Sequence, residues 1–477
     1  MRAPTTPSTR PALLTLAAAA LLAGCSFIPT YEQPAAPVPT AYPAAPAAAD
    51  AAKAAADIDW KDYFADPRLQ RLIGAALENN RDLRVAVLNI EQARAQFQIR
   101  RADQYPSLNG IVSATRAPNT SGQYQNLFQV GLGVSAWEID FFGRIASLKE
   151  QALAQYLATE EARKSTQISL VAAVANAWFN LLADEELLDI SRRTLGTREE
   201  SAQLAKLRLE NGVSSELDYS QAESLTQAAR ATYAQQQRQR ALDENALTLL
   251  LGQPLPQDIR DSIATSRLAN APVMPALPVG LPSDLLVRRP DIRQAEQQLI
   301  AANANIGAAR AAFFPRIALT AQAGTVSDEL SGLFKSGAWG YSLAPQLVLP
   351  IFDAGRNQAG LESAQAGRGI AVAQYEKSIQ SAFREVSDAL AGQATLREQL
   401  AALRAQADAD ARRLQLSDLR YRNGVASYLD LLDAQRSLFG TEQSVVQTHL
   451  VQLQNQVSLY KVLGGGWTEP PAPAAQR

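Results

Sequence analysis

The sequence predicts a mixed fold class, in which long α-helices packed as coiled coils carry a small antiparallel sheet of transmembrane β-strands. Three observations predict it. A pattern of helix, two strands and long helix occurs twice, 209 to 212 residues apart. Each copy contains two stretches of about ten to thirteen residues in which apolar side chains alternate. Each copy also contains a helical stretch of about 68 residues without a proline.

The composition argues against several kinds of function. Basic and acidic residues nearly balance, at 45 and 47, and no basic tract is interleaved with aromatic residues, so nucleic acid is not an expected partner. The sequence has one Cys and one His, which excludes a zinc cluster of these ligands and argues against thiol or histidine catalysis. We therefore expect no enzymatic activity, no cofactor and no structural metal.

The N-terminus has the pattern of a bacterial lipoprotein signal. Basic residues precede an apolar run over residues 12–23 that is too short to span a bilayer, and Leu-Ala-Gly-Cys follows, ending at Cys25. We expect removal of residues 1–24 and lipid attachment at Cys25; an ordinary secretory signal with an incidental Cys is the alternative. Residues 25–57 are rich in Pro and Ala, which favours an extended tether.

The first repeat is expected over residues 58–282. Its opening helices lead to strands at about 106–117 and 125–140. A long helix then reaches a tight turn at 211–215, from which a second helix returns. An irregular, Pro-rich equatorial segment follows at 252–282. On one face of the second strand we place Phe128, Val130, Leu132, Val134 and Ala136.

The second repeat is expected over residues 283–463. Its strands are predicted at about 315–325 and 339–351, and its turn at 423–427. A flexible tail is expected at 464–477. One face of its second strand should carry Trp339, Tyr341, Leu343, Leu347 and Leu349.

Helix length and periodicity predict how the helices pack. At 1.5 Å per residue each long helix would be about 100 Å long. The shorter helices of each repeat, stacked end to end, would match that length. An apolar residue recurs every seven positions, which predicts a left-handed coiled coil, although an ordinary buried stripe would look the same. These residues are Leu432, Phe439, Val446, Leu453 and Tyr460.

The number of strands points to an oligomer. Four strands cannot close a barrel, and an open edge in lipid leaves backbone groups without hydrogen bonds. Several chains should therefore share one barrel, and two, three or four chains would give 8, 12 or 16 strands. The alternative is a small soluble sheet on a coiled-coil stalk.

The two predicted turns have the same chemistry. Asn-Gly ends the incoming helix at Gly212 and at Gly424, where glycine permits a left-handed backbone. A serine then begins the returning helix, and an aspartate three residues later, Asp218 or Asp430, completes a capping box.

Several motifs together carry a family resemblance. They are Cys25 with Pro29, Tyr31 and Pro34; Trp60, Phe64, Asp66-Pro67 and Leu69; residues 288–291; Phe314-Pro315; residues 352–356; and residues 428–435. On these motifs the chain resembles the TolC-like outer membrane factors, in particular their OprM-like, NodT-type lipoprotein branch. The resemblance implies a homotrimer with a 12-stranded β-barrel, four strands per chain, in the outer membrane lipid. A hollow helical barrel would project into the periplasm.

The resemblance implies a passive exit duct in a tripartite efflux pump. Its partners would be a periplasmic adaptor and an inner-membrane pump, typically of the RND type. A type I protein-secretion channel and a non-conducting lipoprotein scaffold are the alternatives. Residues that the resemblance assigns to adaptor docking are Arg208, Gly212, Val213, Arg420, Gly424 and Val425. Those assigned to the pore constriction are Leu429, Asp430 and Asp433, and those assigned as gate tethers are Tyr421, Arg422 and Arg436.

The acidic residues of the predicted constriction have competing explanations. The capping box accounts for Asp430 without any channel, whereas Asp433 lies one turn too deep to cap the helix. In a trimer, three copies of each would focus negative potential on a narrow lumen and favour cations. Alternatively, Arg436 could simply neutralise Asp433 as a pair on one helix. Ala426 stands where some relatives carry a basic residue, which leaves the partner of the tethers open.

Overall fold

The computed structural model describes residues 26–43, 55–278, 280 and 282–467. The predicted signal peptide, the lipid attachment site Cys25 and the last ten residues lie outside the described parts. The first repeat contains η1 (Ala55–Asp57), α2 (Trp60–Tyr63), α3 (Pro67–Asn79), α4 (Arg81–Ala102), β1 (Leu108–Pro118), β2 (Tyr124–Ile139), α5 (Arg144–Glu210), α6 (Glu216–Leu251), α7 (Gln257–Ile263) and η2 (Leu268–Asn270). The second contains α8 (Pro282–Arg288), α9 (Pro290–Ala311), β3 (Arg316–Ser327), η3 (Leu330–Gly332), β4 (Trp339–Val348), α10 (Arg356–Arg422) and α11 (Tyr428–Val462).

The chain forms two compact units, and each contains segments of both repeats. Of the described residues, the strand unit comprises 26–35, 89–160 and 294–377. The helical unit comprises the remaining described residues. Helices α5 and α10 contribute to both units, and each runs for 67 residues without a break. Helix α5 contains a window apolar enough to cross a membrane, but 67% of that window is buried, as in the core helix of a soluble domain.

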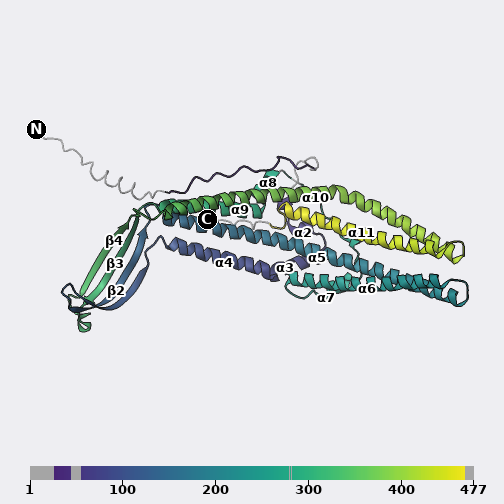
Figure 1. The fold of residues 1–477 in the computed structure, drawn as a ribbon, viewed down its shortest axis with the longest axis horizontal. Coiled ribbons are helices and arrows are strands. Elements are labelled where there is room, and N and C mark those ends of the chain that lie inside the picture. Colours follow the sequence, from purple (N-terminus) through teal and green to yellow (C-terminus); the bar gives the residue numbers. More distant parts are fainter. Residues whose placement is uncertain (1–25, 44–54, 279, 281, 468–477) are drawn as a thin grey trace, which may run out of the picture. The chain divides into compact units, whose positions relative to one another are not determined.

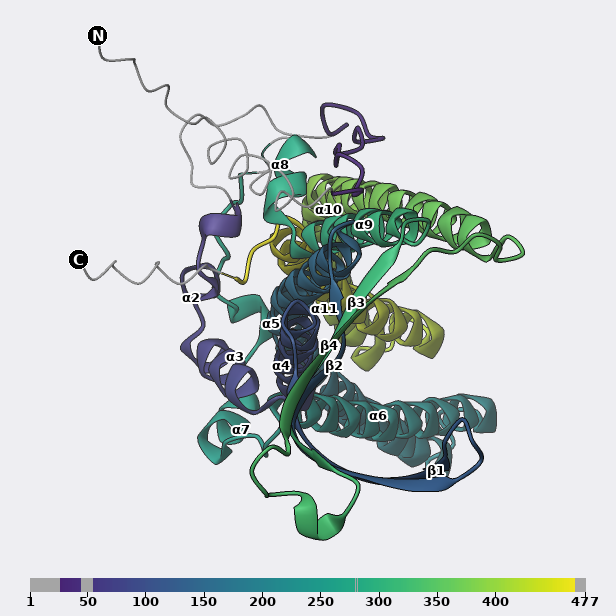
Figure 2. The ribbon, with the colours of Figure 1, turned by 90° about the vertical axis from the view of Figure 1, so that its left-hand side faces the viewer.

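The strand unit contains one antiparallel sheet in the order β1-β2-β3-β4. Each repeat supplies one hairpin, and the β2–β3 pair joins them (Figure 1; β1 is labelled in Figure 2). The register places apolar residues of all four strands on one face, where many are highly exposed. Examples are Leu108 (66%), Val112 (82%), Leu132 (54%), Tyr341 (75%) and Leu343 (64%). The opposite face carries polar groups, including Gln129, which donates to Gln322 Oε1 at 2.6 Å.

Two details of the sheet differ from the sequence prediction. The pairing of β2 shifts between Val134 and Trp137, and Ala136 has a φ of 50°. Ala136 is therefore the extra residue of a β-bulge, so the prediction that it continues the apolar face is wrong, and Trp137 takes that place. Strand β4 ends at Val348 rather than at 351, two residues before Pro350, which has no N–H to donate to a ladder.

A close backbone approach joins the two repeats within the sheet. Gly131 of β2 lies opposite Gly324 of β3. A Cβ atom at Gly131 would lie 2.4 Å from the Ala323 carbonyl oxygen, and one at Gly324 would lie 2.2 Å from the Val130 oxygen. Both distances are far below van der Waals contact. Only glycine therefore permits this strand spacing.

End-to-end helix junctions are built in the same way in both repeats. Asn80, between α3 and α4, donates from Nδ2 to the Leu250 carbonyl near the end of α6, at 2.9 Å. Arg289, between α8 and α9, donates from Nη1 to the Val462 carbonyl at the end of α11, at 3.0 Å. Donor and acceptor positions both recur at the repeat offset. Each junction thus satisfies a carbonyl that a helix end leaves without a partner.

Two terminal segments are packed more closely than the composition suggests. Phe27 stacks on Phe314 with 4.6 Å between ring centroids, and Asn303 of α9 donates to the Pro29 carbonyl at 2.7 Å. The described start of the tether therefore lies along the strand unit. At the other end, the Gly465 N–H donates to the Tyr460 carbonyl at 2.9 Å, and the Arg163 guanidinium lies 4.4 Å from the centre of the Trp467 ring. Positive φ angles at Gly464 and Gly466 allow this fold-back, so residues 464–467 pack against the helical unit.

We predict that Gly131→Ala destabilises the sheet, because the added Cβ would force β2 away from β3. Overpacking of this kind costs about 1–3 kcal/mol. The measurement is the temperature at which the purified oligomer dissociates, followed by its mobility in detergent gels. Gly110→Ala in β1 is the matched control, since a Cβ there meets nothing within 4 Å. Equal stability of the two variants would contradict the prediction.

Candidate functional site

The two helix turns of the helical unit have nearly identical geometry. The Val213 N–H donates to the Arg208 carbonyl, and the Val425 N–H donates to the Arg420 carbonyl, both at 2.9 Å. Gly212 and Gly424 have φ angles of 70° and 73°. These features define a Schellman motif, which uses a left-handed glycine to satisfy the last helical carbonyls. The two valines are left exposed at 73% and 68%.

Capping boxes begin both returning helices. The Asp218 N–H donates to Ser215 Oγ, and the Asp430 N–H donates to Ser427 Oγ, each at 3.2 Å. In return, each serine N–H donates to the aspartate carboxylate. Hydrogen bonds from the Ser215 and Ser214 hydroxyl groups lower the pKa of Asp218. Helix capping therefore explains the position of both carboxylates.

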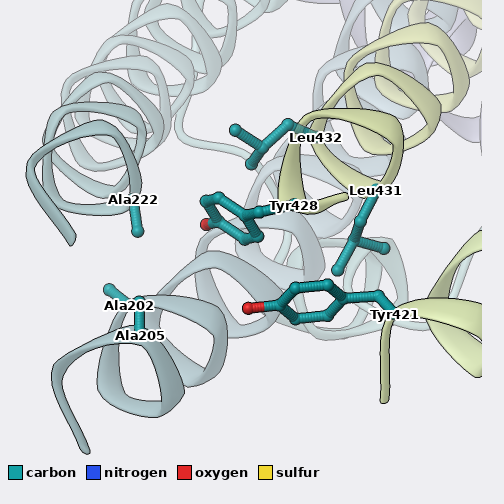
Figure 3. Packing of buried hydrophobic residues seen from close by; sticks show 7 residues of the cluster. All are labelled: Ala202, Ala205, Ala222, Tyr421, Tyr428, Leu431 and Leu432. Atoms are coloured by element: carbon teal, nitrogen blue, oxygen red, sulfur yellow. The ribbon is translucent and has the colours of Figure 1, made fainter. Parts of the chain in front are cut away.

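An aromatic cluster packs the two turns against each other (Figure 3). Helices α5 and α6 form the first helical hairpin, and α10 and α11 form the second. Small residues of the first helical hairpin face large residues of the second. The buried members are Ala202, Ala205, Ala222, Tyr421, Tyr428, Leu431 and Leu432. The Tyr421 and Tyr428 ring centroids are 5.4 Å apart. The Arg208 guanidinium lies 4.6 Å from the centre of the Tyr421 ring. Burial raises the pKa of Tyr428 to about 12, so its hydroxyl stays neutral.

The cluster brings together two residues that the sequence placed in different roles. Arg208 is a predicted docking residue, and Tyr421 is a predicted gate tether. Within one chain they form a cation–π contact, and Tyr421 is only 7% exposed. Tyr421 is thus a packing residue between the hairpins.

The charged residues next to the cluster form ion pairs other than the Asp433–Arg436 pair that the sequence suggested. Asp433 forms an ion pair with Arg413 of α10, and Arg422 pairs with Asp418 at 2.8 Å. Within the described residues no ion pair joins Asp433 to Arg436. Sequence reasoning missed Arg413. The hairpin register could have found it, because Arg413 and Asp433 are equally distant from Asn423.

The predicted constriction residues share an exposed stretch at the start of α11. Leu429 is 67% exposed, and the Asp433 side chain is 55% exposed. Because they are four residues apart, they lie on the same face of the helix, beside the exposed Asp430. The Arg413–Asp433 pair is too exposed to contribute more than about 1 kcal/mol to stability.

We predict that Tyr421→Ala loosens the contact between the two hairpins. Truncation of a large buried aromatic side chain typically costs about 3–5 kcal/mol. Amide hydrogen exchange should therefore become faster in residues 421–432, with little change in the sheet. Tyr421→Phe keeps the ring and its contact with Arg208 and is the control. Unchanged exchange in the alanine variant would show that the cluster does not hold the hairpins together.

Comparison with known proteins places this geometry among efflux channels. Residues 72–253 and 281–465 both match the family model described as outer membrane efflux protein. The probable efflux pump outer membrane protein TtgC of Pseudomonas putida is 48% identical over 476 residues, 98% of each chain. The outer membrane protein OprJ of Pseudomonas aeruginosa is 44% identical over 456 residues, 94% of each chain. The open state of the MtrE outer membrane channel of Neisseria gonorrhoeae superposes with a TM-score of 0.83 at 41% identity, covering 93% of this chain and 98% of that one.

Proposed function

Because the chain belongs to the outer membrane efflux protein family, we propose that it is the outer membrane exit duct of a tripartite efflux pump, formed by three copies. The family model and the relatives confirm the family that the sequence motifs predicted. The observation that carries the proposal is the sheet: four strands with an exposed apolar face, a polar face and two edges. That pattern is the one a lipid-facing barrel wall requires.

The edges of the sheet support assembly from several chains. Strands β1 and β4 are paired on one side only in the described chain. In a bilayer their free N–H and C=O groups would each cost several kcal/mol. Pairing β1 of one copy with β4 of the next removes both edges. Three copies give the 12 strands that the resemblance implies and continue the apolar face around the barrel.

The helical unit would then form the periplasmic part of the duct. We place the exposed valines of the two turns, Val213 and Val425, against a periplasmic adaptor. An inner-membrane pump of the RND type would complete the tripartite assembly. Their exposure and the identical Schellman geometry of the two turns support a repeated docking surface, together with Arg208 and Arg420. Lipid attachment at Cys25 would anchor the chain in the outer membrane.

The gate in this proposal is the start of α11. Leu429, Asp430 and Asp433 of three copies would surround the lumen, and the carboxylates would favour cations. Arg422 and Arg436 are exposed and would serve as tethers to neighbouring copies. Tyr421, the third predicted tether, would in addition hold α10–α11 against α5–α6 through its contact with Arg208. Opening would therefore involve movement of α10–α11 relative to α5–α6 across the aromatic cluster.

We predict that the double variant Asp430→Asn, Asp433→Asn has lower cation selectivity than the native channel. Asparagine retains the cap acceptor and removes the charge, so stability should change by no more than about 1 kcal/mol. The measurement is the reversal potential across a planar bilayer under a salt gradient. Asp258→Ala removes one exposed carboxylate from α7 and is the control. Absence of conductance in the native protein and in this double variant would overturn the proposal that the protein is a duct.

We further predict that Val213→Glu combined with Val425→Glu abolishes adaptor binding. A charge placed in a desolvated contact costs at least about 1.4 kcal/mol, or tenfold in affinity. Copurification with a tagged adaptor measures the effect. Val273→Glu is the matched control, because Val273 is 88% exposed and lies far along the chain from both turns. Equal recovery of the adaptor with both proteins would exclude docking at the turns.

A further inference from the structure

A cleft lined by α5, α10 and α11 lies within the helical unit, next to the aromatic cluster, which Leu414 also contacts. Its volume is about 230 Å³. Helix α5 contributes Thr194 and Arg198, α10 contributes Leu414, and α11 contributes Gln435, Leu438 and Phe439. The apolar side chains Leu414, Leu438 and Phe439 are only partly buried. The cleft therefore combines a polar end with an apolar wall.

Arg198 is a buried cation without a matching anion. Its residue is 7% exposed, and its Nη1 atom is buried without a hydrogen-bond partner. Among the described residues no carboxylate forms an ion pair with it. Burial lowers the pKa of Arg198, and the nearby Arg436 guanidinium acts in the same direction. A buried charge is normally paired, because an unpaired one is strongly destabilising.

Gln435 provides a second unsatisfied group in the same cleft. It is 8% exposed, and its Nε2 donates to Ser201 Oγ at 3.4 Å. Its Oε1 atom is buried and has no hydrogen-bond partner. Most buried polar atoms in proteins are satisfied, so both free atoms are unusual. The Arg198 Nη1 group can donate to an anion, whereas Gln435 Oε1 can only accept a hydrogen bond from a donor.

The one acid that lines the cleft is already used. Glu442 lies 3.8 Å from the Arg193 guanidinium, at the border with an adjoining cleft of about 360 Å³ that both residues also line. Burial raises the pKa of Glu442, and the Arg193 charge opposes this effect. No ion pair joins Glu442 to Arg198 within the described residues. Among the described residues, no anion is therefore paired with the Arg198 guanidinium.

We propose that this cleft binds a small organic carboxylate. The carboxylate accepts hydrogen bonds from Arg198, and its apolar body lies against Leu414, Leu438 and Phe439. The volume is below the roughly 300 Å³ typical of sites for drug-sized ligands, which limits the ligand to about the size of a single ring. Inorganic phosphate or sulfate would match the charge but not the apolar wall. None of the lining residues is itself a predicted lumen or docking residue, although Gln435 lies two residues from Asp433.

Binding at this site would couple α5 to the second hairpin. The cation comes from α5, and the apolar wall comes from α10 and α11. A ligand that contacts both favours the arrangement in which they are packed together, and it stabilises the folded protein by mass action. The expected observation is a rise in thermal stability with carboxylate concentration.

The test uses the purified full-length protein in detergent, with benzoate as the probe. Benzoate should raise the unfolding temperature in a saturable manner, whereas benzamide, which has the same shape without the charge, should not. Arg198→Met should weaken benzoate binding at least about tenfold in isothermal titration calorimetry. Arg192→Met removes the same charge from an exposed position of the same helix and should bind benzoate like the native protein.

A second variant leaves the guanidinium in place. Leu414→Trp should fill the apolar wall and abolish benzoate binding, which keeps the proposal testable if Arg198→Met does not fold. Equal effects of benzoate and benzamide would overturn the proposal. It would also be overturned if benzoate leaves the unfolding temperature of the native protein unchanged.

Discussion

Backbone hydrogen bonding at the edges of the sheet is the constraint on which the rest of this structure depends. Four strands leave one free edge on β1 and one on β4, and a bilayer offers no water to satisfy them. Each chain therefore supplies a fraction of a barrel rather than a complete one. The oligomer is thus implied before any subunit contact is considered.

The sequence predicted the elements that depend on local chemistry. Periodicity located the two 67-residue helices, and the Asn-Gly and Ser-x-x-Asp patterns located both turns, because these signals act within a few residues. Of the heptad residues, Leu432, Val446, Leu453 and Tyr460 are buried, while Phe439 is half-buried and lines the cleft beside Arg198. Period alone cannot tell a seam from the wall of a cavity.

Features that depend on three-dimensional register were missed. The bulge at Ala136 reverses the alternation of β2, and nothing in the local sequence distinguishes it from the residues before it. The Arg413–Asp433 pair requires the exact pairing of α10 with α11, and the environment of Arg198 requires three helices at once. Motifs and family resemblance give residues a role one at a time, whereas contacts such as Arg208 with Tyr421 show which roles are linked.

The helix junctions show how a duplicated architecture can diverge in its response to solution conditions. The Leu250 carbonyl is met by a neutral amide from Asn80, but the equivalent Val462 carbonyl is met by a guanidinium from Arg289. Arg289 also binds Asp291 and Glu385, so its junction belongs to an ionic network. Salt and acid weaken ionic networks far more than neutral hydrogen bonds. Equivalent positions of the two repeats thus hold one helix junction that salt and acid weaken and one that they weaken far less.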